Sequence, residues 1–438
     1  MRATEHDAGI VSWRYWLAPG MGVKRHVTLA VAGGVAFALG AAGAVLWLLG
    51  EGRRTAAEPL ESMLTSRSWA TFGGWASLAA LLAGLALSIW AVRRLNRSLL
   101  SNWLPEPGEA ASRLHDRLRR ARGPRIVALG GGTGLARLLR GLRRETSNLT
   151  AVVAVSDDGG SSGRLRAEFG MPAPGDLVDC LAALSDEEIS LGRLLSYRFA
   201  RGTELRGHTF GNLFLATLTE VEGDFAEALR IANRMLDLRG AVYPVTARPV
   251  TLHARKRDGS ELVGEQHVHE GGGAVERVWL SHAEPEPIPE VLAALRSADL
   301  VVLGPGSLYT STVPPLLVPD VRDALCRSAA LLAYVCNIMT EDGETTGMDA
   351  WDHLEAIEAH LGRYPDVVLM NDQPVDRLRL AAYAEERAGL VQLDAERFEG
   401  AGLTVLRLPL LADGAHAQHD PERLAAALLG IARERSGS

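Results

Sequence analysis

Three glycine-rich segments of this 438-residue chain each follow a short apolar run, and their residue types suit a phosphorylated ligand. The first segment, 130–135, reads GGGTGL and leads directly into apolar residues at helical spacing. Glycine lets the main chain approach a ligand closely, and the first turn of a following helix offers free N–H groups to an anion. Thr133 could cap that helix or donate to a phosphate oxygen. The spacing excludes the dinucleotide fingerprint, whose third glycine would fall on Leu135, and no Gly-Lys-Ser/Thr of a P-loop follows.

The second segment, 156–166, reads SDDGGSSGRLR and also follows an apolar run. Its adjacent carboxylates, Asp157 and Asp158, could hold a divalent cation such as Mg²⁺, bond ribose hydroxyls or act as a base. The alternative is a solvated turn with helix-capping aspartates. Further along, Asp176 precedes another helical pattern, and we predict capping of that helix as its role.

The third segment, 304–311, reads GPGSLYTS. Gly306 would let the main chain approach a ligand, the Ser307 hydroxyl could donate to phosphate, and Tyr309 could stack on a base or bond a sugar. Asn337 likewise follows an apolar run. Polar groups therefore recur where apolar runs stop, which predicts a binding crevice built from several strand ends.

The elements that must position these residues are short apolar runs of strand type separated by helical patterns. They predict an α/β fold with a doubly wound, mostly parallel sheet, in which ligands bind outside the carboxyl ends of the strands where strand order reverses. Short strands over about 242–280, with a hairpin turn at Asp258-Gly259, predict an inserted antiparallel subdomain or lid. The predicted parallel strands are 126–129, 152–155, 300–303, 331–335 and 367–370.

Two further groups of polar residues lie between these strands. Thr209 is predicted to cap a helix that runs to about residue 236, and His208 and Asn212 beside it either face the crevice or are structural. His267 and His269 fall on one face of a predicted strand. We predict no metal site there, because no third ligand follows at suitable spacing.

The first hundred residues differ sharply from the rest. Segments 27–49 and 69–92 contain no charged residue and are long enough to cross a bilayer, although a buried helical hairpin is the alternative. Their flanking basic residues favour both ends in the cytoplasm. We therefore predict a multi-pass membrane anchor over 1–97, a basic linker over 98–123, and a cytoplasmic domain over 124–438. The amphipathic part of the linker either lies along the anionic inner leaflet or is solvated.

Composition narrows the function classes. The formal net charge of −7 gives no indication of nucleic-acid binding. Cys180, Cys326 and Cys336 are odd in number and lack metal-ligand spacing, so a reducing compartment is expected rather than a disulfide framework.

Five segments together resemble the gluconeogenesis factor (YvcK-like) proteins of the CofD-like group, which includes 2-phospho-L-lactate transferase. The resemblance covers about 124–430 and implies a Rossmann-like fold. For the YvcK-like branch it implies binding of UDP-sugars such as UDP-N-acetylglucosamine and regulation of carbon metabolism, cell shape and cell-wall synthesis, with no established reaction. The transferase branch moves a phospholactyl-type group onto a deazaflavin with Mg²⁺. The segments are GGGTGL at 130–135, SDDGGSSGRLR at 156–166, GHTFGNLFLATLTE at 207–220, GPGSLYTS at 304–311 and CNIMTEDGETTG at 336–347.

The resemblance also implies positions for individual residues. The glycine turn, with Thr133, would meet a diphosphate, the two adjacent aspartates would lie at the ribose, the diphosphate or a metal, and Asn212 would line the crevice. Relatives often carry Arg-Asn where this chain has Val178-Asp179, and an arginine where it has Ala382, so the ligand could differ. The predicted ligand-binding residues are Gly131, Gly132, Thr133, Asp157, Asp158, Asn212, Gly306, Ser307, Tyr309 and Asn337.

These observations predict a membrane-tethered, cytoplasmic UDP-sugar-binding regulator. Cell-wall synthesis proteins and a second copy of the chain are the partners that it could take, and no catalytic residue is assigned. The alternative is a Mg²⁺-dependent transferase acting on a nucleotide-activated donor, although the sequence offers no nucleophile–base pair.

Overall fold

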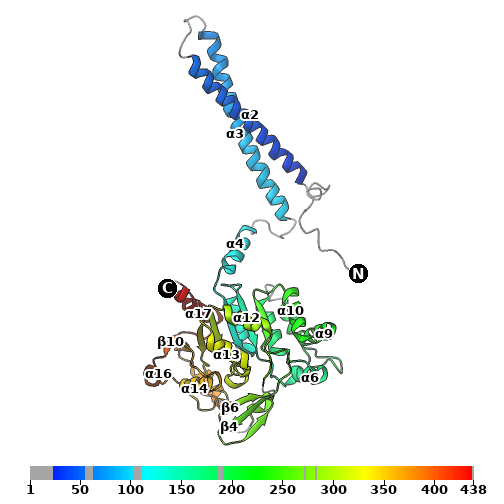
Figure 1. Cartoon of the computed structure of the whole chain (residues 1–438), viewed down its shortest axis with the longest axis vertical. Coiled ribbons are helices and arrows are strands. Elements are labelled where there is room, and N and C mark those ends of the chain that lie inside the picture. Colours follow the sequence, from blue (N-terminus) through cyan, green and yellow to red (C-terminus); the bar gives the residue numbers. More distant parts are fainter. Residues whose placement is uncertain are drawn as a thin grey trace. The chain divides into compact units, whose positions relative to one another are not determined.

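The computed structural model describes residues 23–54, 63–101, 110–185, 191–270, 273–281 and 284–436. The chain divides into two compact units, which cover residues 1–116 and 117–438. Figure 1 shows a pair of long helices in the first unit and a sheet with helices around it in the second.

The first unit contains two long helices, α2 (Val23–Arg54) and α3 (Met63–Ser101), which pack against each other along much of their length. Segments Arg25–Leu49 and Gly74–Arg97 are long and apolar enough to cross a membrane. Their closest approach depends on glycine, because a Cβ on Gly84 would lie 2.4 Å from the Phe37 amide nitrogen. Small residues of this kind allow helix backbones to pack tightly in a lipid environment.

A seven-stranded parallel sheet forms the centre of the second unit, in the order β10-β9-β8-β7-β1-β2-β3. The order reverses between β1 and β7. Because crossover connections are right-handed, the helices that follow the two halves cover opposite faces. The predicted doubly wound fold is confirmed. The strands are β1 (Ile126–Gly130), β2 (Leu149–Val153), β3 (Ala241–Pro244), β7 (Leu300–Leu303), β8 (Leu331–Val335), β9 (Val367–Asn371) and β10 (Thr404–Leu408).

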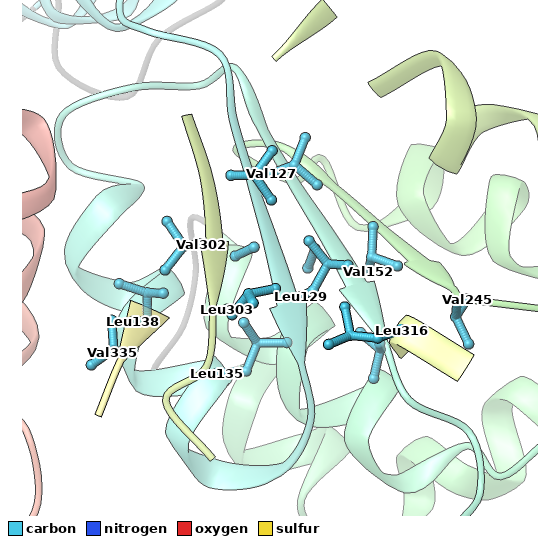
Figure 2. Close-up of a cluster of buried hydrophobic side chains, with 14 of the residues drawn as sticks. Val127, Leu129, Leu135, Leu138, Val152, Val245, Val302, Leu303, Leu316 and Val335 are labelled. Carbon is cyan, nitrogen blue, oxygen red and sulfur yellow. The ribbon is translucent and has the colours of Figure 1, made fainter. Parts of the chain in front are cut away.

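The middle strands are buried on both faces, which explains their unbroken apolar sequences. Figure 2 shows Leu129 and Leu303 from β1 and β7 close to Leu135 and Leu138 of helix α5 (Gly132–Leu142), and all four side chains are fully buried. This packing fixes the end of β1 and the beginning of α5. The glycine turn between them is therefore held in place by the core.

The inserted antiparallel sheet is confirmed with a shorter range than predicted. It contains β4 (Leu252–Lys256), β5 (Glu261–Val263) and β6 (Val275–Leu280), with β4 in the middle. The residues near 242 were predicted to belong to it, but β3 pairs in parallel with β2 at the edge of the main sheet. A short helix, α11 (Glu265–Val268), follows β5, so the predicted strand carrying His267 and His269 is wrong.

Further helices complete the two units. The final helix, α17, packs on α5. The bounds are α4 (Ala110–Ala121), α6 (Gly160–Phe169), α7 (Gly175–Leu184), α8 (Arg193–Leu195), α9 (Phe210–Glu222), α10 (Phe225–Met235), α12 (Pro289–Ser297), α13 (Pro319–Arg327), α14 (Ala350–Leu361), α15 (Arg377–Glu385), α16 (Ala395–Ala401) and α17 (Pro421–Ser436), with a π-helical turn η3 (Leu308–Thr312) and a 3-10 turn η4 (Pro314–Leu317).

Candidate functional site

The turns after β1 and β7 touch each other at the point where the strand order reverses. A Cβ on Gly134 would lie only 2.4 Å from the carbonyl oxygen of Pro305, so no larger residue fits between the two turns. Open α/β sheets bind ligands in the crevice at such a reversal. The structure therefore brings the first and third glycine-rich segments together, as the sequence predicted.

A cavity of about 320 Å³ opens beside these turns, and we call it the switch-point cavity. It has contributions from both glycine turns, the loop after β8, helix α15 and the chain before α17. Six of the predicted ligand-binding residues line it, namely Gly131, Gly132, Thr133, Gly306, Ser307 and Asn337.

Three polar atoms on the lining residues of this cavity have no hydrogen-bond partner in the described part of the chain. They are Arg137 Nε, Asn337 Oδ1 and His419 Nε2. Burial, with a smaller contribution from the positive charge of Arg137, lowers the pKa of His419 to about 4, so the ring is neutral at pH 7. The Cys336 main chain accepts a hydrogen bond from the ring, which leaves Nε2 as an acceptor. Buried polar atoms without partners are costly, and a ligand can satisfy them.

The Asp176 carboxylate is hydrogen-bonded to one of the main-chain amides of the glycine turn. Its Oδ2 accepts a hydrogen bond from the Gly132 amide at 2.6 Å. The predicted capping role is wrong, because Pro174 takes the N-cap position of α7 and Asp176 lies within its first turn. Burial raises the pKa of Asp176 to about 7, and the negative charges of Asp157 and Asp179 add to the rise.

Residues 131–134 of the glycine turn all line the switch-point cavity, although the Gly132 amide is already bound by Asp176. The N-cap of α5 is Gly131, and the Asp176 carboxylate, rather than Thr133, accepts from the first amide of this helix, so Thr133 does not have the capping role that was one of its two predicted possibilities. Thr133 is exposed and lines the switch-point cavity, as does Gly134. The first N–H groups of a helix have no partner within it. An anion in this cavity would therefore meet free amides and the positive end of the α5 dipole.

A second cavity, of about 530 Å³, is lined by residues from the segment after β2 and from the first turns of α7, and we call it the carboxylate cavity. Asp157 and Asn212 line it, so the predicted site residues divide between two neighbouring cavities. Asp176 borders both, because it lines the carboxylate cavity and binds the glycine turn of the other. Burial raises the pKa of Glu265, also in this lining, and the charge of Asp157 raises it further.

The residues at the start of α9 form a connected hydrogen-bond network beside this cavity. Thr209 accepts from the Asn212 amide at 3.2 Å, which confirms its predicted capping role. The Asn212 side chain donates to Ser161 Oγ at 3.0 Å, and the same hydroxyl lies 3.0 Å from His208 Nδ1. His208 is buried and does not line the cavity, so it is the structural residue of the predicted pair.

The adjacent aspartates of the second glycine-rich segment point to different partners. Asp157 Oδ1 accepts from the Gly159 amide at 2.8 Å. Asp158 Oδ1 accepts from the Gln266 amide at 3.0 Å and so ties the second segment to α11 of the insertion. Asp157 lines the carboxylate cavity, and Asp158 lines neither cavity. Their predicted contact with a ribose, a diphosphate or a Mg²⁺ ion stays a prediction.

Two predicted residues of the third segment differ from expectation. Tyr309 is 2% exposed and its ring packs edge-on against His360 at 6.1 Å between centroids, so it lies in the core and lines neither cavity. The reason is the turn η3, which directs residue 309 inward. Ser307 lines the switch-point cavity, but its hydroxyl donates to both carboxylate oxygens of Glu341, at 2.7 and 2.9 Å.

The sequence analysis missed several residues of these cavities. Arg137 and His419 carry unpartnered atoms; Arg137 comes two residues after the first glycine-rich segment but was not singled out, and His419 lies far from all three segments in the sequence. Glu341 and Glu344 lie in the CNIMTEDGETTG segment, yet their proximity to His269 could not be read from spacing. The ligand atoms of these three residues, which could hold a metal ion, all lie within 4.8 Å of one another.

The fold and the two cavities define a doubly wound α/β protein with a crevice at its strand-order reversal, and comparisons with known proteins assign its family. The model of the 2-phospho-L-lactate transferase CofD family matches residues 126–411. The gluconeogenesis factor of Bacillus subtilis is 41% identical over 313 residues, covering 71% of this chain and 99% of that protein. A crystal structure of a protein from Bacillus halodurans has a TM-score of 0.68 at 40% identity, covering 70% of this chain and all of that chain. This chain belongs to the CofD family, among relatives that carry the name gluconeogenesis factor.

A relative from Deinococcus radiodurans extends the similarity toward the N-terminus. It is 43% identical over 436 residues, covering 95% of this chain and 89% of that protein. Because the first 116 residues are more than a quarter of this chain, an alignment of that length includes most of the first unit. The Bacillus relatives match the second unit alone over nearly their whole length, so a second unit without the long helices exists as a folded protein.

Proposed function

We propose that this protein is a membrane-tethered cytoplasmic regulator of carbon metabolism, cell shape and cell-wall supply, and that it binds a UDP-sugar such as UDP-N-acetylglucosamine. The observation that carries the proposal is the switch-point cavity, which is lined by the first turn of α5 and by three residues that carry unpartnered polar atoms. The names of the Bacillus relatives support the regulatory part, and the two apolar helices support the tether. Partners in cell-wall synthesis would be recruited by the ligand-bound form.

Each part of the cavity suits one part of such a ligand. The amides of the first turn of α5 and the Arg137 guanidinium offer donors and positive charge to a diphosphate. Asn337 Oδ1 and His419 Nε2 are acceptors, so they suit the N–H of a uracil ring or the hydroxyls of a sugar. A volume of about 320 Å³ is at the lower end of the range for small-molecule pockets, so the sugar would extend toward the opening.

Isothermal titration of UDP-N-acetylglucosamine into a protein of residues 110–438 tests the proposal. We expect saturable binding that weakens at least tenfold in Arg137→Ala, because a charge-assisted hydrogen bond is worth about 1.5–3 kcal/mol. Arg144→Ala is the matched control, since Arg144 comes just after the same helix, pairs with Glu422 and does not line the cavity. No heat with any UDP-sugar from a folded sample would reject the proposal.

A second candidate is a Mg²⁺-dependent transferase, which the carboxylate cavity beside the switch-point cavity favours. A nucleotide-activated donor would lie in one cavity and an acceptor in the other. Incubation with Mg²⁺ and candidate donors, followed by mass spectrometry, separates the candidates. Turnover that is lost in Asp157→Asn supports the transferase, whereas binding without turnover supports the regulator.

A further inference from the structure

His269, Glu341 and Glu344 bring three metal-ligand side chains together from two distant segments. His269 follows α11 of the insertion, and the two glutamates lie in the loop after β8. One ligand atom from each residue lies within 4.8 Å of the others, and His269 Nε2 is 3.7 Å from Glu344 Oε2. An imidazole nitrogen and two carboxylates are a donor set that first-row divalent metals accept.

The two carboxylates are already oriented by hydrogen bonds from the protein. Glu344 is fully buried, and it accepts from the Tyr309 amide at 2.6 Å and the Thr310 hydroxyl at 3.4 Å. Glu341 accepts from Ser307, as described above. Such outer-sphere hydrogen bonds typically orient metal ligands. Neither glutamate forms an ion pair with a lysine or arginine in the described part of the chain, so their paired negative charge has only His269 beside it.

The histidine is held against the loop by close packing. A Cβ on Gly343 would lie 2.3 Å from the His269 carbonyl oxygen, so the loop and the insertion are in direct contact at this point. The short distance between His269 and the glutamates therefore follows from how the insertion packs on the main sheet. Buried carboxylates near each other are costly unless a cation or protons compensate them, and burial together with the charge of Glu341 raises the pKa of Glu344 to about 8.

The cluster connects the two cavities. Glu341 lines the switch-point cavity and His269 lines the carboxylate cavity. The first of these cavities also has an unsatisfied polar atom in its lining: His419 is only 8% exposed, and its buried Nε2 has no hydrogen-bond partner in the described part of the chain. A cation on the cluster would be accessible from the cavity in which we place the diphosphate.

We propose that His269, Glu341 and Glu344 bind a divalent first-row metal ion of the Mn²⁺ type, with open positions toward the switch-point cavity. The imidazole favours such an ion over Mg²⁺ or Ca²⁺, which prefer oxygen ligands alone. Ion binding stands on the cluster itself. Contact between the ion and a diphosphate rests on the proposed function, and it would neutralise phosphate charge that the neighbouring carboxylates otherwise repel.

Electron paramagnetic resonance of free Mn²⁺ during titration of the full chain in detergent tests the proposal without any nucleotide. We expect one saturable ion per chain, with affinity reduced at least tenfold in His269→Ala and in Glu341→Gln. His267→Ala is the matched control, because His267 lies two residues away, is exposed and pairs with Glu270. Far-ultraviolet circular dichroism confirms that each variant is folded.

Two results would overturn the metal site: no saturable Mn²⁺ binding by the unchanged protein, or equal affinities in both variants and the control. Repeating the titration with UDP-N-acetylglucosamine separates the two proposals. Tighter Mn²⁺ binding with the sugar nucleotide supports contact between the ion and the diphosphate. Mn²⁺ binding to a protein that shows no UDP-sugar binding keeps the metal site and rejects the proposed function.

Discussion

We predict that the free energy of unfolding of the second unit decreases as pH rises, because the buried carboxyl group of Asp176 must then ionise. Its pKa is raised from 3.8 to about 7 in the folded protein, chiefly by burial. A carboxyl group with a raised pKa binds its proton more tightly when folded, so its contribution is favourable at low pH and is lost as pH rises through about 7. Asp176→Asn removes the titration, and the amide oxygen can still accept from Gly132.

The magnitude follows from the two pKa values. Full ionisation of a group with this shift costs about 4 kcal/mol of unfolding free energy, and about 2 kcal/mol of that cost is already present at pH 5. The change in hydrogen-bond strength on replacing the carboxylate is about 1 kcal/mol and is taken as constant with pH. The stability of Asp176→Asn relative to the unchanged protein should therefore increase by about 2–3 kcal/mol between pH 5 and pH 8. This is an upper estimate, because the side chain borders a cavity and is partly accessible to water.

Urea unfolding of residues 110–438 at pH 5, 6, 7 and 8, followed by circular dichroism, measures this difference. Asp413→Asn, at an exposed position, is the control and should follow the unchanged protein at every pH. Parallel profiles for Asp176→Asn and the unchanged protein would refute the reasoning, because they would show that the carboxylate does not titrate differently on folding.

Three further predictions concern packing and capping. Gly134→Ala should destabilise the second unit by about 2–3 kcal/mol, because the new methyl group would force the turns after β1 and β7 apart, whereas Gly400→Ala has open space and should be neutral or slightly stabilising in urea unfolding. Thr209→Ala should cost about 1 kcal/mol through loss of the α9 cap, checked by the same assay. Gly84→Leu should lower the thermal unfolding temperature of the first unit in detergent by separating α2 from α3, and Gly34→Leu, with no neighbour within 4 Å, should not.

The parts of the fold that the sequence predicted depend on local signals. Unbroken apolar runs identified five of the strands, because buried parallel strands need such residues on both faces. Strand β10 was missed, since its mixture of polar and apolar residues reflects a partly exposed edge. The glycine turn at 130–135 was found because a close approach of two main chains leaves room for glycine alone.

The parts of the site that were missed depend on contacts between distant segments. Capping and buried hydrogen bonding use the same residue types, so Asp176 was misassigned as an N-cap, whereas its helix begins two residues earlier than expected. Tyr309 was misplaced because a π-helical turn redirects its ring into the core. His269 and Glu341 could not be paired, since their proximity depends on the packing of an insertion whose position no local pattern encodes.

Strand β1 places the connector and the glycine turn at opposite ends of one buried strand. The connector helix α4 ends at Ala121, and the chain enters the middle of the sheet at Ile126, the amino end of β1. The glycine turn that lines the switch-point cavity follows the carboxyl end of β1, roughly 16 Å away for five residues at about 3.3 Å each. Because β1 is buried over its whole length, a displacement at either end would be transmitted through the core of the second unit.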